Sequence, residues 1–414
     1  MKTVGIIAEY NPFHNGHAWQ IREIRRRFPD AGIVVAMSGI FTQRGTIAIL
    51  DKWKRAEVAV RHGASLVLEL PAVFATRSAQ YFAGGGVRLL DRLGVVDALA
   101  FGSECDDLAK LSQWAKETDA NKKSSVLKDG LHNGSSYAAA LTGAAPADAA
   151  IRQPNVILAA EYLRAIERFH AVLVPLPLPR FSAGHHDMEI SAESERPIAS
   201  ASAIRAALAA GNERDALRAV PEDVEAMLSE AWDHGYGDTS RLFRPMLAKL
   251  LTTPAEELRA VLGVNEGIEH RLRRAALAAH SYEEWVETVR SKRYPRARVR
   301  RLLLHLLLSL TKETAALFDE EGPLYARVLA FDDHGRRLLQ AAKKRGNIPV
   351  ITKLSRFLSA RALDTGALSP AQEMLAFDLR ASALAALTSS PVGHPPANAD
   401  FLISPMYSPK KETM

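Results

Sequence analysis

Cysteine is almost absent from this 414-residue chain, which contains only Cys105. A single thiol cannot form an intramolecular disulfide, and its isolation excludes cysteine-rich zinc and iron–sulfur sites. Aromatic residues make up 7% of the chain and charged residues 24%, which is ordinary for a soluble globular protein. The composition therefore excludes collagen-like and disordered chains. A chain of this length is expected to fold as two or three domains.

Long apolar runs are also missing. The apolar run at the N-terminus is broken at Glu9, too early for the hydrophobic region of a signal peptide. The densest later stretch, residues 302–310, is interrupted by His305 and has about half the length of a membrane span. We therefore expect a cytoplasmic protein without a membrane segment.

The excess of positive charge is small. Lys and Arg number 53 against 47 Asp and Glu, which gives a formal net charge of +6. Such a balance suits a polyanionic partner, but solubility alone also accounts for it. The net charge by itself assigns no partner.

Short apolar segments alternate with helical patterns in the first half of the chain. Segments of this kind, separated by helices, predict a doubly wound parallel sheet with right-handed crossovers. The expected strands are residues 3–8, 33–37, 66–70, 98–101 and 172–176.

Further along the chain, runs of Val and Ile give way to segments rich in Ala, Leu, Arg and Glu with helical periodicity. We predict an α/β domain over residues 1–213 and a mainly helical domain over residues 214–388. Residues 389–414 are rich in Pro, Asn and Ser, which predicts an irregular C-terminal segment.

The most informative segment is Glu-Tyr-Asn-Pro-Phe-His-Asn-Gly-His at residues 9–17, between the first expected strand and the first helix. Doubly wound sheets bind ligands at the carboxyl ends of their strands, and a helix N-terminus attracts phosphate. His14 and His17 can donate hydrogen bonds to α- and β-phosphate oxygens as charge builds up in a transition state. Gly16 between them allows a close backbone approach to a ligand. Attack on an α-phosphate needs positioning and charge stabilisation rather than an enzyme nucleophile.

The run from His14 to His17 resembles the HxGH signature of the nucleotidyltransferase superfamily. A longer ordered set of segments is similar to the bacterial tRNA(Met) cytidine acetate ligase family, and the similarity spans most of the chain. The set comprises residues 9–17, 37–39, 43–45, 51–53, 68–71, 101–104, 154–155, 161–163, 184–187, 199–205 and 292–301. As an ordered set, these segments are far more specific than HxGH alone.

This resemblance implies a fold and an activity. The fold is a Rossmann-like, doubly wound parallel sheet of the nucleotidyltransferase type, followed by a mainly α-helical tRNA-binding domain. The activity is that of an ATP-dependent ligase that activates acetate as acetyl-adenylate and acetylates N4 of the wobble cytidine of elongator tRNA(Met). Acetate, ATP and elongator tRNA(Met) are thus the expected partners, with Mg²⁺ bound mainly through phosphate oxygens and water.

The resemblance also implies roles for individual residues. The catalytic residues are His14, His17 and Arg205, of which the arginine meets the leaving pyrophosphate. One position departs from the pattern, because Gln20 stands where the family is expected often to have His, and Gln carries no positive charge. The implied nucleotide-binding residues are Ile7, Ala8, Glu9, Tyr10, Asn11, Pro12, Phe13, His14, Asn15, Gly16, His17, Gln20, Gly102, Asn155, Arg180, Ser200 and Ser202.

Basic residues are concentrated in two stretches of the second half. This density suits phosphate contacts that position RNA without reading its sequence, and Tyr294 can stack on a base. A solvated helix face is the alternative explanation of the first stretch. Given the resemblance, we predict RNA contacts by Arg290, Lys292, Arg293, Tyr294, Arg296, Arg298, Arg300, Arg301, Lys343, Lys344 and Arg345.

The residues alone leave two other functions possible. A nucleotidyltransferase with a small-molecule acceptor, as in pantothenate or nicotinamide-nucleotide enzymes, does not require the basic helical half. An RNA-binding protein with a nucleotide-sensing domain does not require the intact pair His14 and His17. We expect no protein metal site at His185, His186 and Asp187, because adjacent histidines point in different directions and no third spaced ligand is evident.

Overall fold

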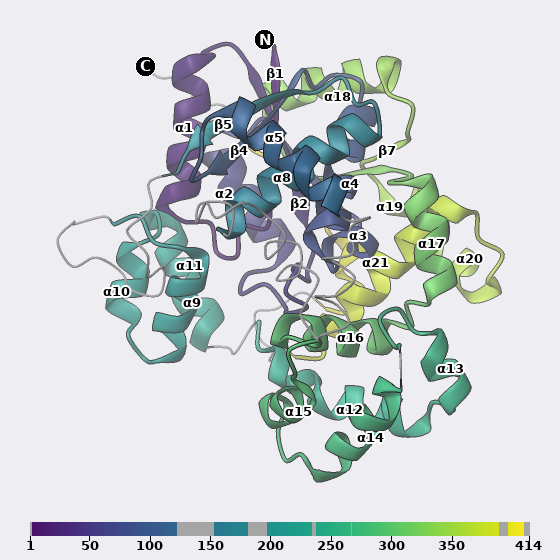
Figure 1. Cartoon of the computed structure of the whole chain (residues 1–414). Helices are drawn as coiled ribbons and strands as arrows, with labels where there is room; N and C mark the ends of the chain where they lie inside the picture. Colours follow the sequence, from purple (N-terminus) through teal and green to yellow (C-terminus); the bar gives the residue numbers. More distant parts are fainter. Residues whose placement is uncertain are drawn as a thin grey trace.

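The computed structural model describes residues 2–121, 153–180, 197–233, 237–265, 267–388 and 396–409. The sequence candidates His185, His186 and Asp187 lie outside these residues. Figure 1 shows a central sheet flanked by helices, with a body of helices α12–α16 beneath it. In the described part of the chain, no helix is both long enough and apolar enough to cross a membrane.

One sheet of eight strands forms the centre of the molecule, in the order β5-β4-β1-β2-β3-β6-β7, with β8 also paired to β6. The first five strands run parallel, and β6 runs antiparallel to β3. The bounds are β1 Thr3–Ala8, β2 Gly32–Ser38, β3 Leu66–Leu70, β4 Ala98–Ser103, β5 Val174–Pro179, β6 Ala326–Phe331, β7 Val350–Ile351 and β8 Met406–Tyr407. The predicted α/β fold class is confirmed, and the first four predicted strands agree within two residues.

The fifth strand begins two residues later than predicted and continues to Pro179. Its prolines at positions 175, 177 and 179 lack N–H groups, so only the intervening residues can donate to β4. An edge strand has only one neighbouring strand, so the backbone groups on its outer side need no partner strand. Proline at alternate positions is therefore tolerated there. The strand therefore extends through the prolines instead of ending at them.

Helices cover both faces of the sheet. The first pair, α1 Asn15–Arg27 and α2 Lys52–Arg61, connects β1 to β2 and β2 to β3. The chain then returns through α3 Ala72–Ala75 and α4 Ala79–Arg92 to β4, and continues through α5 Leu108–Asn121 and α8 Pro154–Arg168 to β5. The strand order thus reverses between β1 and β4, and in doubly wound sheets ligands bind at the carboxyl ends of the strands at such a point.

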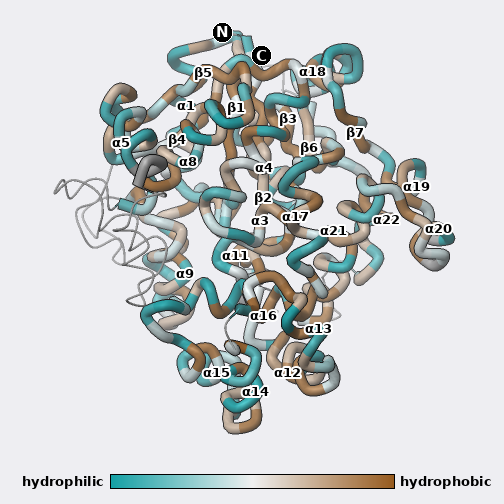
Figure 2. Tube along the Cα trace, turned by 45° about the vertical axis from the view of Figure 1, so that its right-hand side comes forward, coloured by the Kyte–Doolittle hydropathy of each residue, from teal (hydrophilic) through white to brown (hydrophobic). Residues whose placement is uncertain are grey.

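The second half of the chain is mostly helical, but it also returns to the sheet. Its helices are α9 Ala201–Ala209, α10 Glu213–Arg218, α11 Glu222–Asp233, the 3₁₀ helix η2 Thr239–Leu242, α12 Phe243–Thr252, α13 Ala255–Ala260, α14 Ile268–Ala278, α15 Tyr282–Val289, α16 Arg296–Leu308, α17 Lys312–Glu321, α18 Asp333–Arg345, α19 Leu354–Phe357, α20 Ala360–Thr365, α21 Pro370–Ala386 and α22 Ala399–Leu402. The prediction of helices and an irregular tail overlooked β6, β7 and β8. Hydrophobic residues gather along the central strands in Figure 2, and β6 is buried among them.

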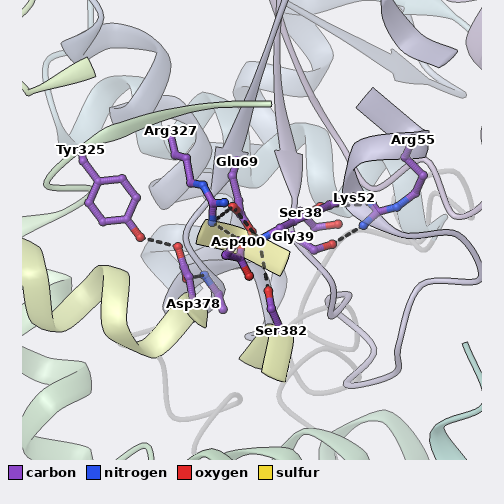
Figure 3. Close-up of polar contacts among 11 residues, drawn as sticks. Ser38, Gly39, Lys52, Arg55, Glu69, Tyr325, Arg327, Asp378, Ser382 and Asp400 are labelled. Atoms are coloured by element: carbon purple, nitrogen blue, oxygen red, sulfur yellow. Dashed lines mark hydrogen bonds and ion pairs between the residues drawn. The ribbon is translucent and has the colours of Figure 1, made fainter. Parts of the chain in front are cut away.

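A cluster of buried charges fastens these late elements to the sheet (Figure 3). Lys52 Nζ lies 2.8 Å from Glu69 Oε1 and 2.6 Å from Asp400 Oδ1. Arg327 on β6 lies 3.0 Å from Glu69 Oε2 and 2.5 Å from Asp400 Oδ1. Burial alone raises the pKa of Asp400, but Lys52 and Arg327 lower it to about 2. The two cations and two anions therefore compensate one another inside the protein.

A further carboxyl group, Asp378 on α21, lies beside this cluster (Figure 3). It accepts the N–H of Ala72 at 2.7 Å and the hydroxyl of Tyr325. Burial, followed by the charge of Glu69, raises the pKa of Asp378 to about 7. Helix α21 is thereby tied to the end of β3, through α3, and to the start of β6.

Replacing Asp400 by Asn should destabilise the protein strongly. The substitution leaves two buried cations with one carboxylate, and breaking a buried pair in this way costs about 3 kcal/mol or more. Urea unfolding measures the change in the free energy of unfolding. The matched variant Asp333→Asn removes an exposed partner of Arg336 and should cost less than about 1 kcal/mol. Equal losses in the two variants would show that the buried cluster is not what holds α22.

Candidate active site

The motif loop follows β1 at the switch point and leads directly into α1. His14 is the N-cap of that helix, and its Nδ1 accepts the N–H of Gly16 at 3.1 Å. Nδ1 of His17 accepts the N–H of His14 at 3.2 Å, so the two histidines form a reciprocal capping box. Their rings stack with centroids 3.6 Å apart. Helix capping thus fixes both imidazoles in one orientation.

These hydrogen bonds also define the protonation of the two rings. Burial, then the charges of Arg180 and Arg205, lowers the pKa of His14 to about 3. Burial, then His14 and Arg180, lowers the pKa of His17 well below 6.5. Both rings are therefore neutral near pH 7, and because each Nδ1 accepts an amide N–H, each proton resides on Nε2. Each ring presents one N–H donor that its helix cap does not use.

The two residues between the histidines have structural tasks. The side-chain amide of Asn15 donates to the carbonyls of Pro197 and Arg218, each at 3.0 Å. A Cβ at Gly16 would lie 2.9 Å from the ring of His14 and 3.3 Å from Ile198. Besides the ligand approach expected from the sequence, Gly16 therefore has a packing role, because it leaves room for the His14 ring. Asn15 ties the segment before α9 and the end of α10 to the motif.

Arginines from two later segments approach the motif. Arg205 on α9 donates to the carbonyl of Asn11, and its Nη2 lies 3.4 Å from Ser202 Oγ. Ser200 caps α9 by accepting the N–H of Ala203 at 3.1 Å. Arg180 follows β5, and its charge acts on both His14 and His17. Two guanidinium groups thus accompany two neutral imidazoles.

The opposite side of the switch point is formed by the end of β4 and the start of α8. A Cβ at Gly102 would meet nothing within 4 Å, so the backbone there borders open space. Asn155 donates to Glu104 Oε1 at 2.5 Å. The motif after β1, Gly102 near the end of β4 and Arg180 after β5 therefore lie at the carboxyl ends of neighbouring parallel strands.

The remaining predicted residues in the motif region differ in exposure. Tyr10 and Phe13 are buried, with ring centroids 4.9 Å apart, and Tyr10 also packs against His17 at 4.7 Å. Ile7 is buried in β1, whereas Gln20 is partly exposed one turn beyond His17. The aromatic pair therefore forms a wall behind the histidines.

Arg55 on α2 holds the two strand ends that carry the site, although the sequence interpretation did not select it. The side chain is fully buried and donates to the carbonyls of Glu9 at 2.6 Å and Ser38 at 3.1 Å. It also donates to Leu50 at 3.0 Å and to Gly39 (Figure 3). The side chain thus fixes the backbone at the ends of β1 and β2.

The loop between β2 and α2, residues 39–51, connects the motif to the helical body. The carboxylate of Glu9 accepts the N–H of Gln43 at 2.6 Å, and the carbonyl of Gln43 accepts from Arg301 on α16 at 3.1 Å. Gly45 has φ +73°, and a Cβ there would lie 2.6–2.9 Å from the backbone of Arg300 and Arg301. Glycine is needed for this close contact. Helix α16 is consequently docked beside the motif.

The basic stretch at residues 290–301 is largely engaged with the protein. Arg290 and Arg296 pair with Glu287 at 3.2 and 2.5 Å, and Arg300 pairs with Glu283 at 2.7 Å. These acidic partners all lie on α15, which reduces the net charge of the stretch. The predicted phosphate surface is therefore less positive than the sequence suggested.

The position of Tyr294 contradicts the prediction that its ring stacks on a base. It is 6% exposed, its hydroxyl donates to the carbonyl of Asn265 at 3.2 Å, and Arg298 lies over its ring at 4.3 Å. Base stacking requires an accessible ring face. The predicted stacking is wrong for this conformation, because Tyr294 packs inside the helical body.

The second basic stretch lies at the other end of the sheet. The carbonyl of Arg345 approaches Gly94, and the N–H of Asn347 donates to Arg92, both of which precede β4. Lys343, Lys344 and Arg345 therefore lie at the amino ends of the parallel strands, which we call the amino edge. The motif lies at the carboxyl ends of these strands, the carboxyl edge. The two predicted RNA clusters do not share a face.

Arg44 is a further basic residue at the site that the sequence interpretation did not select. It is exposed in the loop after β2, and its charge, like that of Arg300, lowers the pKa of Arg205. Burial is the larger cause and brings this pKa to about 10, while Glu9 acts in the opposite direction. Four charged groups from separate segments thus meet at the carboxyl edge. A single arginine in a loop does not form a cluster of basic residues in the sequence, and only the fold brings it close to the motif.

Known proteins resemble this chain over most of its length. The model of the HIGH Nucleotidyl Transferase family matches residues 1–397. A tRNA(Met) cytidine acetate ligase of Syntrophotalea carbinolica is 38% identical, over 92% of this chain and 93% of that protein. The chain belongs to the tRNA(Met) cytidine acetate ligase family. A relative of the same name from Syntrophomonas wolfei is 35% identical over 98% of this chain and 99% of its own length.

Solved structures show the same fold. A crystal structure of Thermotoga maritima TmcAL bound with alpha-thio ATP has a TM-score of 0.85 and 28% sequence identity, covering 99% of this chain and 100% of that one. The apo form of the same protein matches equally well. The resemblance stated from the sequence is therefore confirmed, and this chain is a member of a family of ligases.

The neutral histidine pair can be tested by nitrogen NMR. With ¹⁵N-labelled histidine, the signals lost in His14→Gln and His17→Gln should report neutral Nε2–H rings that do not titrate from pH 8 down to pH 5. In urea-unfolded protein the same rings should titrate near about 6.5. A folded-state midpoint near neutrality, or a proton on Nδ1, would contradict the assignment.

Proposed function

We propose that this protein joins acetate to elongator tRNA(Met) in two steps at the carboxyl edge of its sheet. Acetate is activated with ATP as acetyl-adenylate, and the acetyl group then passes to N4 of the wobble cytidine. The observation that carries the proposal is the fixed pair of imidazole donors at the switch point, in a chain 38% identical to a tRNA(Met) cytidine acetate ligase.

In the first step, an acetate oxygen attacks the α-phosphorus, and the bond to the β-phosphate oxygen breaks to release pyrophosphate. The Nε2–H groups of His14 and His17 donate to the phosphate oxygens as negative charge grows. Arg180 and Arg205 add permanent positive charge, which is more effective in a partly buried site than in water. Gly102 and Asn155 line the nucleotide side of the crevice. The first step thus needs no enzyme thiol or hydroxyl nucleophile.

Magnesium enters this proposal with the nucleotide. Among the described residues, no group of three or more His, Cys, Asp or Glu side chains can hold a metal ion. The imidazole N–H groups and arginines of the site suit phosphate oxygens rather than a hard cation. Mg²⁺ would therefore be held by the ATP phosphates and water, where it neutralises part of the polyphosphate charge.

In the second step, the cytidine amine attacks the acetyl carbonyl carbon, and AMP leaves. The wobble base must leave the anticodon stack to reach the crevice. Arg44 and the start of α16 border the carboxyl edge and are proposed to contact the RNA backbone. The buried Tyr294 has no part in this contact.

Product analysis tests the proposal against its alternatives. Purified protein is incubated with labelled acetate, ATP and tRNA transcripts, and the RNA is digested to nucleosides. The proposal requires label in N4-acetylcytidine from elongator tRNA(Met), with one AMP released for each acetyl group. Adenylation of a different small acid or a nucleotide without labelled RNA favours the small-molecule function. Tight tRNA binding without turnover favours a nucleotide-sensing RNA-binding protein.

Replacing His17 by Ala should impair the first step selectively. Loss of one preorganised donor lowers such rates by about 100-fold to 1,000-fold. Acetate-dependent exchange of labelled pyrophosphate into ATP measures the step, and filter binding measures tRNA affinity, which should change less than about two-fold. His270→Ala on the exposed surface of α14 serves as the control. A His17 variant that keeps its exchange rate would refute the role of the pair.

Replacing Arg44 by Ala should weaken tRNA binding without affecting pyrophosphate exchange. Removing one phosphate contact should reduce the slope of log affinity against log salt by about 0.7–0.9. Binding measured from 50 to 200 mM salt gives the slope. The pair Lys343→Ala and Lys344→Ala, at the amino edge, should have the smaller effect. The reverse ranking would place the RNA at the amino edge.

A further inference from the structure

The proposed second step produces a proton that some group must take. Cytidine N4 is a weakly nucleophilic amine, and it becomes acidic once its lone pair has bonded to the acetyl carbon. General base catalysis of such a step contributes about 100-fold to 10,000-fold. This inference rests on the proposed function, because it concerns only the transfer of acetyl from the adenylate to RNA.

Most polar groups of the site cannot act as this base. Nδ1 of His14 and Nδ1 of His17 each accept a backbone N–H, and their Nε2 atoms carry protons. Arg180 and Arg205 have no acceptor atom and keep their charge. Carboxylates are the remaining candidates. Those nearest the ends of β1 and β4 are Glu9 and Glu104, because Asp106 and Asp107 come later in the chain, where Asp107 accepts N–H groups at the start of α5.

The two carboxylates differ in the accessibility of their second oxygen. Glu104 accepts a hydrogen bond from Asn155 through Oε1 at 2.5 Å, and its Oε2 is buried without a hydrogen-bond partner among the described residues, closed off from solvent and substrate. Glu9 accepts the N–H of Gln43 through Oε1 at 2.6 Å, and its Oε2 has no hydrogen-bond partner among the described residues. The Glu9 side chain is partly exposed, so this oxygen can reach a substrate. A free carboxylate is also a poor phosphate ligand, which sets Glu9 apart from its neighbours in the motif.

The charges around Glu9 place it between the two substrates. Its carboxylate acts on Arg205, which bonds to the motif at Asn11, and on Tyr162 of α8 across the switch point. Arg44 and Arg300 act on the same Arg205 from the side of the helical body. The carboxylate therefore lies where an amine arriving past Arg44 would meet an adenylate held by the histidines.

We infer that Glu9 Oε2 accepts the proton of the attacking cytidine amine. As N4 bonds to the acetyl carbon, the carbonyl electrons move to oxygen and the N4 proton passes to Oε2. The carbonyl re-forms as the bond to the adenylate oxygen breaks, and AMP leaves with that electron pair. The Glu9 proton is then released to water, which restores the carboxylate. The hydrogen bond from the Gln43 N–H to Oε1 restrains the side chain and leaves Oε2 available to the substrate.

The variant Glu9→Gln tests this role because its amide oxygen can still accept from Gln43. Acetate-dependent pyrophosphate exchange measures any loss of nucleotide binding in this variant. The kcat of tRNA acetylation should fall about 100-fold or more beyond that loss, with an unchanged KM for tRNA. Hydroxylamine, a stronger nucleophile that needs no base, should capture acetyl from the adenylate with no loss beyond that of the exchange. Glu57→Gln on α2 is the matched control for loss of one carboxylate.

Three results would overturn the inference in distinguishable ways. Wild-type acetylation kinetics in Glu9→Gln would show that no base acts at this position. Equal losses in exchange, hydroxylamine capture and acetylation would assign Glu9 to adenylate formation or to loop structure. Absence of N4-acetylcytidine with the wild-type protein itself would overturn the proposed function, and the role of Glu9 with it.

Discussion

The guanidinium of Arg55 is buried where β1 and β2 end, and it donates to the carbonyls of Glu9, Ser38 and Gly39. A charge in this position is tolerated because several carbonyl dipoles surround it. The same contacts fix the exit of β1, from which the motif begins, and the loop after β2, on which α16 docks. The side chain of Glu69 packs against Gly39, so the buried cluster of Lys52, Glu69, Arg327 and Asp400 supports this arrangement from behind. Placement of the site therefore depends on buried polar groups as much as on the apolar core.

The charge distribution at the carboxyl edge follows from the way these buried polar groups position the site. Two imidazoles are held neutral with outward N–H donors, and the permanent charge comes from Arg180 and Arg205. Such a site presents donors to a polyanion without requiring protonated histidine near pH 7. The edge also receives Arg44 and Arg300, so residues far apart in the sequence act together on the charge of Arg205. Under the proposed function, the nucleotide and the RNA would both be bound at this edge.

Sequence patterns predicted the parts of this protein that local rules determine. The buried strands of the first half follow from apolar runs, and helical spacing predicted the helix after β1. That helix begins at Asn15, inside the segment expected as a loop, because the two motif histidines cap it. The return of β6 was missed because a six-residue strand between helices carries no distinct period. Burial of Tyr294 was missed because its basic neighbours suggest a surface, whereas α15 supplies acidic partners that only the fold brings near. Arg55 could not be selected, since its importance comes from contacts with distant segments. Arg44 lies in the segment 43–45 that carries part of the resemblance, but only the fold brings it near Arg205.

An isotope-trapping experiment tests most directly whether the adenylate is both formed and consumed in one site at the carboxyl edge of the sheet. Enzyme is first loaded with labelled acetate and ATP, and it is then mixed with elongator tRNA(Met) together with a hundred-fold excess of unlabelled acetate. If the adenylate stays in the crevice until the cytidine arrives, the first turnover carries nearly undiluted label into N4-acetylcytidine. Label diluted to the level of the mixed acetate pool would contradict a single site for the two steps.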